Sequence, residues 1–234
     1  MPPRHLLQTI FSSLTRIPTT STSPTRWTLL RTLKSENPND MQGDLHGTAK
    51  FTPLRSTATP PNSAENEGYT DLLYSEEGSL PQSFGPGLRW TKKYIWRLSA
   101  SGRISVWFVK VDNKKHKPQA GNEEEEEDED EADYLFHDFD FISPESETTP
   151  ASASASESGS GLEFVPPPVP PEAGPGTRVV AARGNHLCIK DMYRTAYAFR
   201  VDEESGEVLS WASRHVVRGP KKGQDIVNLY SRGL

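Results

Sequence analysis

Apolar and polar residues alternate along many short segments of this chain, and this alternation limits the possible folds more than any other feature. In the segment 134–142, for example, Leu135, His137, Phe139 and Phe141 fall on one face. Successive side chains of a β-strand point to opposite faces, so the pattern predicts strands with one buried face. About ten segments alternate in this way or are rich in β-branched and aromatic residues: 26–34, 44–52, 69–78, 88–99, 103–111, 134–142, 177–185, 192–201, 207–219 and 225–233.

Short turn sequences such as "SASG" (99–102) and "EESG" (203–206) join these segments, so neighbouring strands are expected to pair antiparallel. Almost no helical pattern separates them, which argues against parallel βαβ units. A long antiparallel meander has two free edges unless it closes. We therefore expect one all-β domain over residues 1–234, a single antiparallel up-and-down β-barrel of about eight to ten strands. A β-sandwich is the alternative.

Two stretches lack the apolar residues that a packed core requires. Residues 112–132 contain nine consecutive acids, Glu123–Glu131, and residues 143–176 consist almost entirely of Ser, Thr, Pro, Gly, Ala and Glu. Neither stretch can bury enough apolar surface to offset the entropy lost on ordering, so we expect an acidic and a Ser/Pro-rich disordered insertion. The segment 55–68 has a similar composition and is expected to form a surface loop.

The net charge of −6 comes from the acidic run. Outside the run, 23 acidic residues stand against 26 Lys and Arg, a balance too even and too scattered to indicate nucleic-acid binding. The run itself is typical of a solvated loop, with docking to a basic partner as the alternative. The single cysteine, Cys188, excludes an internal disulfide and a multi-cysteine zinc site, and it fits a reducing compartment.

The N-terminal region has two interpretations. Its first 35 residues contain several arginines and much Ser and Thr but no acid, as in a mitochondrial transit peptide. Alternatively it forms a short helix with an apolar stripe of Leu6, Leu7, Ile10, Phe11 and Leu14. No apolar run approaches the roughly 20 residues that cross a bilayer, and no secretory signal is visible. We therefore expect an intracellular protein without a membrane partner, either cytoplasmic or, under the first interpretation, mitochondrial.

Several motifs occur in an order typical of one protein family. They are "RWTLLRTL", "GDLHGTAKF", "YSEEG", "KKYIWR", "YLFHDFDF", "HLCIKDMYRTAYAF", "VVRGPKK" and "NLYSR". Together they cover nearly the whole chain outside the insertions, and the chain resembles the domain of unknown function 6314, an uncharacterised family of bacteria and fungi. Two positions depart from the family pattern: the glycine of a Gly-x-Trp start is missing before Trp27, and Gly223 and Gln224 stand where an aromatic residue is usual. The resemblance implies no activity and therefore bears on the fold.

A looser resemblance is to lipocalin-like (calycin) barrels, which begin with a tryptophan on the first strand and end with an arginine after the last. Trp27 and Arg232 occupy the corresponding places in this chain. We expect the Arg232 guanidinium to stack on the Trp27 indole and close the barrel end, a contact that contributes on the order of 1 kcal/mol.

A barrel of this size has an interior just wide enough for side chains or one small ligand. Aromatic residues with polar tips fall on faces that are otherwise apolar, as expected for a ligand cavity; a packed core that binds nothing is the alternative. His186 and Cys188 join this inner face only if "CIKD" (188–191) forms a turn. We thus expect a small, partly apolar ligand, which the sequence does not identify. The candidate lumen residues are Tyr94, Trp96, His137, His186, Cys188, Asp191, Tyr193 and Tyr197.

Covalent and metal chemistry have little support in the sequence. On a regular strand His186 and Cys188 are about 7 Å apart at Cα, which is not ideal for an activating hydrogen bond. The spacing H-x-C-x-x-D (186–191) matches no recognised zinc pattern. Haem ligation stays an open alternative, with His137 as the axial ligand, and no cofactor is assigned.

Two other functions remain open beside ligand binding. One is an enzyme on the same barrel that uses His137 or His186 with Tyr193 or Asp191 as acid–base partners. The other is an interaction module whose Pro-rich "VPPPVPP" (165–171) docks to a partner as a polyproline II helix.

The turn "RGPKKG" (218–223) precedes the last strand, and its Gly-Pro pair is a turn signal. Lys221 and Lys222 in this turn are candidates for holding an anionic group at the mouth of the barrel. Solvated loop lysines are the alternative interpretation. The sequence predicts no oligomeric state.

Overall fold

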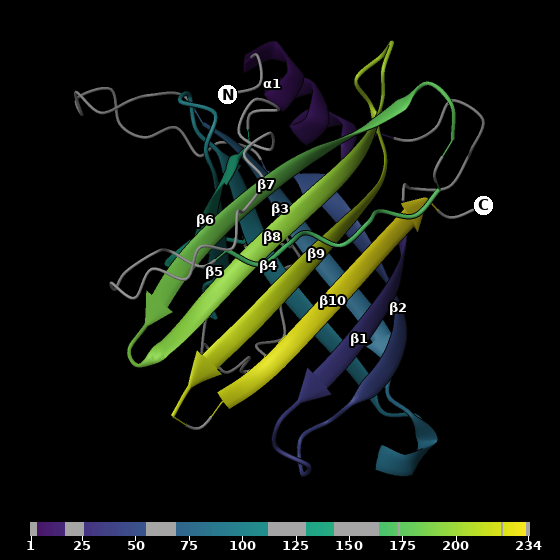
Figure 1. The fold of residues 1–234 in the computed structure, drawn as a ribbon, viewed down its shortest axis with the longest axis vertical. Coiled ribbons are helices and arrows are strands. Elements are labelled where there is room, and N and C mark those ends of the chain that lie inside the picture. Colours follow the sequence, from purple (N-terminus) through teal and green to yellow (C-terminus); the bar gives the residue numbers. More distant parts are fainter. Residues whose placement is uncertain are drawn as a thin grey trace, which may run out of the picture.

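The computed structural model of the chain describes residues 4–16, 26–54, 69–111, 130–142, 164–172, 174–220 and 222–232. Ten strands of this part form one closed antiparallel barrel, in which each strand pairs with the next and the last returns to the first (Figure 1). The predicted all-β up-and-down barrel is confirmed, and the sandwich alternative is wrong. The strands are β1 (Trp27–Ser35), β2 (Gly43–Pro53), β3 (Thr70–Ser79), β4 (Arg89–Leu98), β5 (Ile104–Val109), β6 (Ala132–Phe141), β7 (Thr177–Cys188), β8 (Asp191–Asp202), β9 (Val208–Gly219) and β10 (Lys222–Arg232).

The seam between β1 and β10 closes the barrel. Its register runs from Trp27 opposite Arg232 to Ser35 opposite Gln224, so β1 is paired along its whole length on this side. The other side of β1 pairs with β2. Because the seam pairs β1 with β10, these two strands leave no free edge on which another chain can add a strand. The seam also brings residues from the two ends of the sequence side by side. The pairing of β6 with β7 is limited to Asp140 with Arg183 and Phe141 with Ala182.

A short helix, α1 (Arg4–Ser13), covers one end of the barrel (Figure 1). Leu7, Ile10 and Phe11 of its apolar stripe are buried in the barrel core, as is Leu14 just beyond the helix. The short N-terminal helix expected from the sequence is confirmed. With these side chains in the core, α1 closes its end of the barrel as an apolar plug. No helix among the described residues is long and apolar enough to span a bilayer.

Hydrogen bonds fix the plug to the strands around it. The Trp27 indole donates to the Leu14 carbonyl at 3.2 Å, and the Val208 amide donates to Ser13 Oγ at 3.0 Å. Arg232 donates to the carbonyl oxygens of Val208 at 2.8 Å and Ser13 at 3.2 Å. Its guanidinium carbon lies 5.0 Å from the centre of the Trp27 ring. The structure thus contains the Trp27–Arg232 contact that the sequence predicts.

Part of the Pro-rich segment packs on the outer wall of the barrel. Residues 164–172 cross the outer face near β8, β9 and β10, as the thin green trace in Figure 1 shows. Arg200 donates to the carbonyls of Pro170 at 3.2 Å and Pro171 at 3.0 Å, and the Ser210 hydroxyl also donates to Pro171. The structure describes this part of the predicted Ser/Pro-rich insertion, in which carbonyls without a strand partner accept hydrogen bonds from the barrel wall.

Most of the other predicted loops lie outside the described residues. This applies to 55–68, 112–129 and 143–163. The end of the acidic insertion is described, and there the Lys110 amide donates to the Glu131 carbonyl at 2.8 Å. Their side chains form an exposed ion pair of 3.0 Å. This contact leads into β6, which begins at Ala132.

A β-bulge changes the face to which the start of β6 points. His137 pairs with Val106 and Leu135 pairs with Trp107, so Phe136 is an extra residue on β6. The bulge reverses the alternation: Phe136 lines the interior cavity, whereas Leu135 is 36% exposed. The expectation that Leu135 shares the inner face of His137 is wrong for this reason.

We expect Arg232→Lys to lower the free energy of unfolding by about 2 kcal/mol, because lysine keeps the charge but loses the planar stacking and most hydrogen bonds to the carbonyls. Urea unfolding followed by circular dichroism measures the loss. Arg103→Lys is a matched control, since Arg103 pairs with Asp138 and Asp140 on the surface and its side chain is 55% exposed. Such pairs contribute at most about 1 kcal/mol. Equal losses in the two variants would contradict the role of Arg232.

Candidate functional site

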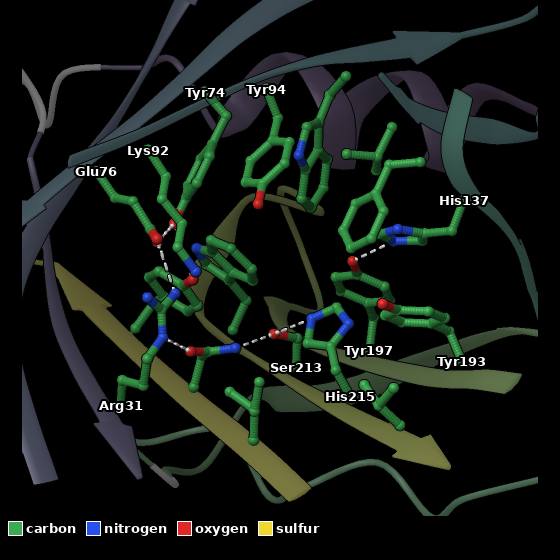
Figure 2. Close-up of a pocket in the computed structure, with 18 of the residues that line it drawn as sticks. Arg31, Tyr74, Glu76, Lys92, Tyr94, His137, Tyr193, Tyr197, Ser213 and His215 are labelled. Atoms are coloured by element: carbon green, nitrogen blue, oxygen red, sulfur yellow. Dashed lines mark hydrogen bonds and ion pairs between the residues drawn. The ribbon is translucent and has the colours of Figure 1, made fainter. Parts of the chain in front are cut away.

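The barrel interior is filled near α1 and hollow toward the opposite, open end. Near α1, the side chains of Trp27, Leu29, Phe199 and Val208 have no exposed surface. Toward the open end a cavity of about 140 Å³ remains, and Figure 2 shows side chains from across the barrel pointing into it. Its aromatic lining is Tyr74, Tyr94, Trp96, Phe136, Tyr193, Tyr197, Trp211 and Tyr230, and its polar lining is Arg31, Glu76, Lys92, His137, Ser213, His215, Gln224 and Asn228.

A buried ion pair lies on one side of the cavity. Arg31 Nη2 is 2.9 Å from both carboxylate oxygens of Glu76, and the two side chains are 8% and 1% exposed. Arg31 Nε donates to Asn228 Oδ1 at 2.6 Å, across the seam between β1 and β10. Burial disfavours the charge of Arg31, but the Glu76 carboxylate outweighs this effect and the pKa of Arg31 lies above its usual value. The lumen therefore holds a permanent cation beside its counter-ion.

Phenol hydroxyls surround the Glu76 carboxylate. Tyr74 donates to it, and the Tyr74 hydroxyl lies 2.8 Å from that of Tyr230. Burial, reinforced by Tyr230, raises the pKa of Tyr74 well above its usual value. Burial and then the Glu76 carboxylate raise the pKa of Tyr94 to about 12 and also raise that of Tyr230. These phenols keep their protons at neutral pH and act as neutral hydrogen-bonding groups.

A second set of hydrogen bonds leads from the ion pair to a histidine. Asn228 Nδ2 donates to Ser213 Oγ at 2.9 Å, and Ser213 Oγ lies 3.2 Å from His215 Nε2. Figure 2 shows each of these contacts as a dashed line, and together they lead from Arg31 to His215. Burial, followed by repulsion from Arg31 and Lys92, lowers the pKa of His215 to about 3. The His215 ring is therefore neutral at physiological pH.

His137 lies on the far side of the cavity with Tyr197. Its Nε2 is 2.7 Å from the Tyr197 hydroxyl, and its ring centre is 5.6 Å from that of His215. Burial, with repulsion from His215 and His186, lowers the pKa of His137 well below its usual value. Burial, with the phenols Tyr230 and Tyr94, raises the pKa of Tyr197. The Nδ1 atoms of both histidines are buried without a hydrogen-bond partner in the described part of the chain.

The structure brings together five of the eight predicted lumen residues. Tyr94, Trp96, His137, Tyr193 and Tyr197 line the cavity. Their positions follow from the strand alternation, which directs them inward from β4, β6 and β8.

The other three predicted lumen residues lie beyond the cavity, at the tip of the β7–β8 hairpin. The expected turn is present, and opposite pairing of His186 with Tyr193 and of Cys188 with Asp191 puts these residues on one face. The hairpin, however, extends past the cavity wall. Cys188 is exposed, so its expected place in the lumen is wrong, and neither His186 nor Asp191 lines the cavity.

The predicted anion site at the mouth is only partly described, since Lys221 lies outside the described residues. Lys222 Nζ is 2.9 Å from an Asp191 carboxylate oxygen and 3.2 Å from the Tyr193 hydroxyl. The hydrogen bonds to Asp191 and Tyr193 raise the pKa of Lys222. This lysine therefore already has a carboxylate as its anionic partner.

Seven polar lumen residues were missed in the sequence: Arg31, Glu76, Lys92, Ser213, His215, Gln224 and Asn228. Each lies two residues from an inward apolar or aromatic residue on its own strand, as Arg31 does from Leu29 and Asn228 does from Tyr230. The same alternation that predicts the strands therefore contained the signal. Charged and small polar residues were not expected on an inner face.

The described residues offer no ready metal centre, because no three His, Cys, Asp or Glu side chains among them converge on one point. Haem ligation by His137 also fits poorly. Its Nε2 is engaged by Tyr197, and the 140 Å³ cavity is close to the roughly 150 Å³ that holds a benzene ring. A porphyrin is several times larger than one such ring.

These features define a closed ten-stranded antiparallel barrel with a small polar cavity at its open end. A family of unknown function, DUF6314, matches residues 24–155 and 174–232, which is most of the chain. The chain therefore belongs to this family. No curated protein and no solved structure in the comparisons matches it.

Glu76→Gln is expected to lower the free energy of unfolding by about 3 kcal/mol, because Arg31 would keep a buried charge without its counter-ion. Glu77→Gln is the matched control: Glu77 pairs with Arg26 and Arg89 at the surface, so its loss should stay below about 1 kcal/mol. Urea unfolding at pH 7 compares the two. The double variant Arg31→Met/Glu76→Leu should lose less than Glu76→Gln alone. Similar losses at Glu76 and Glu77 would show that the ion pair is not the stabilising contact.

Stability should also fall as the pH drops below about 6.5. The unfolded chain takes up protons at His137 and His215 in this range, whereas the folded lumen, with both pKa values lowered, does not. Each buried histidine then makes the free energy of unfolding fall by about 1.4 kcal/mol per pH unit as the pH drops. His215→Gln should remove one such slope between about pH 6 and 4. Urea unfolding at several pH values measures it.

His46→Gln provides the control for this experiment, because His46 lies on the outer surface of β2 and is exposed. The His46→Gln variant keeps the carboxylates and the other histidines of the parent protein. Their contributions to the pH dependence of the free energy of unfolding therefore cancel when the variants are compared. An unchanged slope in His215→Gln would mean that His215 is charged or solvated in the folded protein.

Proposed function

We propose that the chain binds a small, partly apolar molecule in the open half of the barrel lumen. The observation that carries the proposal is a cavity of about 140 Å³ walled mostly by aromatic rings, with a few polar side chains such as His137 and Lys92 among them. Sites for small molecules combine an apolar wall with a few polar groups that fix orientation.

The cavity volume limits the buried part of the ligand to about one aromatic ring. Its 140 Å³ is below the roughly 300 Å³ at which drug-sized sites begin. A dry cavity of about 150 Å³ accommodates benzene. A longer molecule fits only if the rest of it extends through the open end of the barrel, where Lys92 and Tyr193 lie.

Ionisation of the lining favours binding over acid–base catalysis. General acids and bases work best when their pKa values lie near the working pH. His137 and Tyr197 are within hydrogen-bond reach, yet burial moves the pKa of the first down and that of the second up. The other partners considered for an enzyme, His186 and Asp191, do not line the cavity.

A role in partner docking has less support. The described part of the Pro-rich segment already contacts the barrel wall through Arg200 and Ser210. A partner would have to displace these bonds. The lipocalin likeness, in contrast, agrees with lumen binding and is supported by the Trp27–Arg232 contact at the plugged end.

Calorimetric titration with phenol, a single ring with one hydroxyl, tests the proposal. We expect saturable binding, accompanied by shifts of the Trp96 and Trp211 indole N–H signals in NMR spectra, because both rings line the cavity. Ile226→Phe adds a ring to the cavity lining and should weaken binding about tenfold or more. Native mass spectrometry of the purified protein gives an independent readout, since a carried ligand adds its mass.

Leu229→Phe is the matched control, because Leu229 lies on the same strand with the opposite parity and points outward. It should bind phenol like the parent protein. Binding that survives Ile226→Phe unchanged, or that is lost equally in both variants, would overturn the lumen site.

A further inference from the structure

We infer that Lys92 is a covalent attachment site, at which the side-chain amine forms an imine with a small aromatic aldehyde whose ring occupies the cavity. This inference rests on the proposed function and adds the chemical class of the ligand and the residue that holds it. It follows from the direction of the Lys92 side chain, from the lack of a partner for its amine and from the cation beside it.

The alternation along β4 directs Lys92 into the barrel. Tyr94 and Trp96 follow it at intervals of two residues, and all three line the cavity. Figure 2 shows the Lys92 side chain beside Glu76 and Tyr74, directed toward the interior. Residue 92 is nevertheless exposed, because it lies where the barrel opens. A molecule that enters from solvent therefore meets this lysine at the entrance to the cavity.

The amine of Lys92 lacks its natural counter-ion. The register puts Glu76 directly opposite Lys92 on β3, where a carboxylate and a lysine would ordinarily attract each other. Both oxygens of this carboxylate, however, lie 2.9 Å from Arg31 Nη2, and Tyr74 also donates to it. In the described part of the chain, Lys92 has no hydrogen bond and no ion pair of its own. No partner group therefore holds the amine away from a ligand.

The surroundings also favour the neutral form of this amine, which is the form that has a lone pair to donate. Burial lowers the pKa of Lys92, and repulsion from Arg31 lowers it further, while the Glu76 carboxylate opposes the shift without reversing it. Desolvation and a neighbouring cation are the two means by which proteins activate a lysine as a nucleophile. Lys92 has both.

Imine formation at this place requires no oxidant, reductant or metal ion. The lone pair of the neutral amine attacks the carbonyl carbon, the C=O π electrons move to oxygen, and one proton passes from nitrogen to oxygen to give a carbinolamine. The nitrogen lone pair then expels the hydroxyl, which leaves as water with a proton from solvent. A C=N bond remains, and water entering through the open end reverses the sequence.

The cavity favours an aldehyde on a single ring. Its volume of about 140 Å³ holds about one such ring. A ketone would bring a second substituent on the carbonyl carbon, for which this volume leaves little room. An aldehyde adds a single carbon outside the ring, on the side where Lys92 lies.

Reductive trapping with benzaldehyde tests the inference on the full chain. Cyanoborohydride supplies the hydride that converts an imine into a stable benzylamine, and peptide mass spectrometry locates the benzyl group. Lys93 is the matched internal control, because it is the next residue, points outward and pairs with Asp130 at 3.2 Å. Lys92 should be labelled at least about tenfold faster than Lys93. Equal labelling of the two lysines would overturn the inference.

Two further variants connect the labelling to the cavity. Lys92→Met should abolish the fast label and still bind phenol, which shows that the lumen is intact, whereas Lys93→Met should keep the fast label. Ile226→Phe fills the cavity and should slow labelling of Lys92 about tenfold without changing that of Lys93. Fast labelling of Lys92 that Ile226→Phe leaves unchanged would overturn the role of the cavity in the reaction.

The outcomes separate the inference from the function on which it rests. If phenol binds in the lumen but Lys92 is labelled no faster than Lys93, the imine is excluded while the cavity remains a binding site. If phenol does not bind and Lys92 is not labelled preferentially, the proposed function itself fails.

Discussion

Closure of the barrel between β1 and β10 is the constraint on which both ends of the molecule depend. The register that puts Trp27 opposite Arg232 also puts Arg31 opposite Asn228. One pair holds the plugged end through ring stacking and hydrogen bonds, and the other begins the polar network of the cavity. A slip of one residue at this seam would turn each of these side chains to the other face of the sheet. The seam therefore couples the integrity of the fold to that of the site.

The polar half of the lumen does not stabilise the barrel as well as apolar packing would. A buried ion pair rarely stabilises a protein more than well-packed apolar residues would. Near α1 the same barrel uses such packing, with Trp27 and Phe199 fully buried. Arg31 and Glu76 appear only where the interior is hollow. Their placement beside the cavity, not in the plug, is what the proposed binding in the lumen would require.

Alternation along the chain predicts the ten strands because every strand has one face against the interior. It also puts Arg31 on the face of Trp27 and Leu29, so part of the site was accessible from sequence. The rest depends on features that alternation does not contain. The bulge at Phe136 reverses the face of Leu135, and His186 has the correct face but lies too far along its strand to reach the cavity. Cavity volume depends on how deeply α1 fills the barrel, which only the packed structure reveals.

The lining of the cavity is polar, yet four of its titratable groups stay neutral near physiological pH. The phenols Tyr74 and Tyr197 have pKa values raised by burial, and the imidazoles His137 and His215 have lowered ones. Near neutral pH, none of these four groups changes its charge. In the binding that we propose, the charges of these groups are therefore fixed before a ligand arrives. Any pH dependence of binding near neutral pH should then come from Lys92, whose pKa burial lowers, or from the ligand, because these four lining groups stay uncharged.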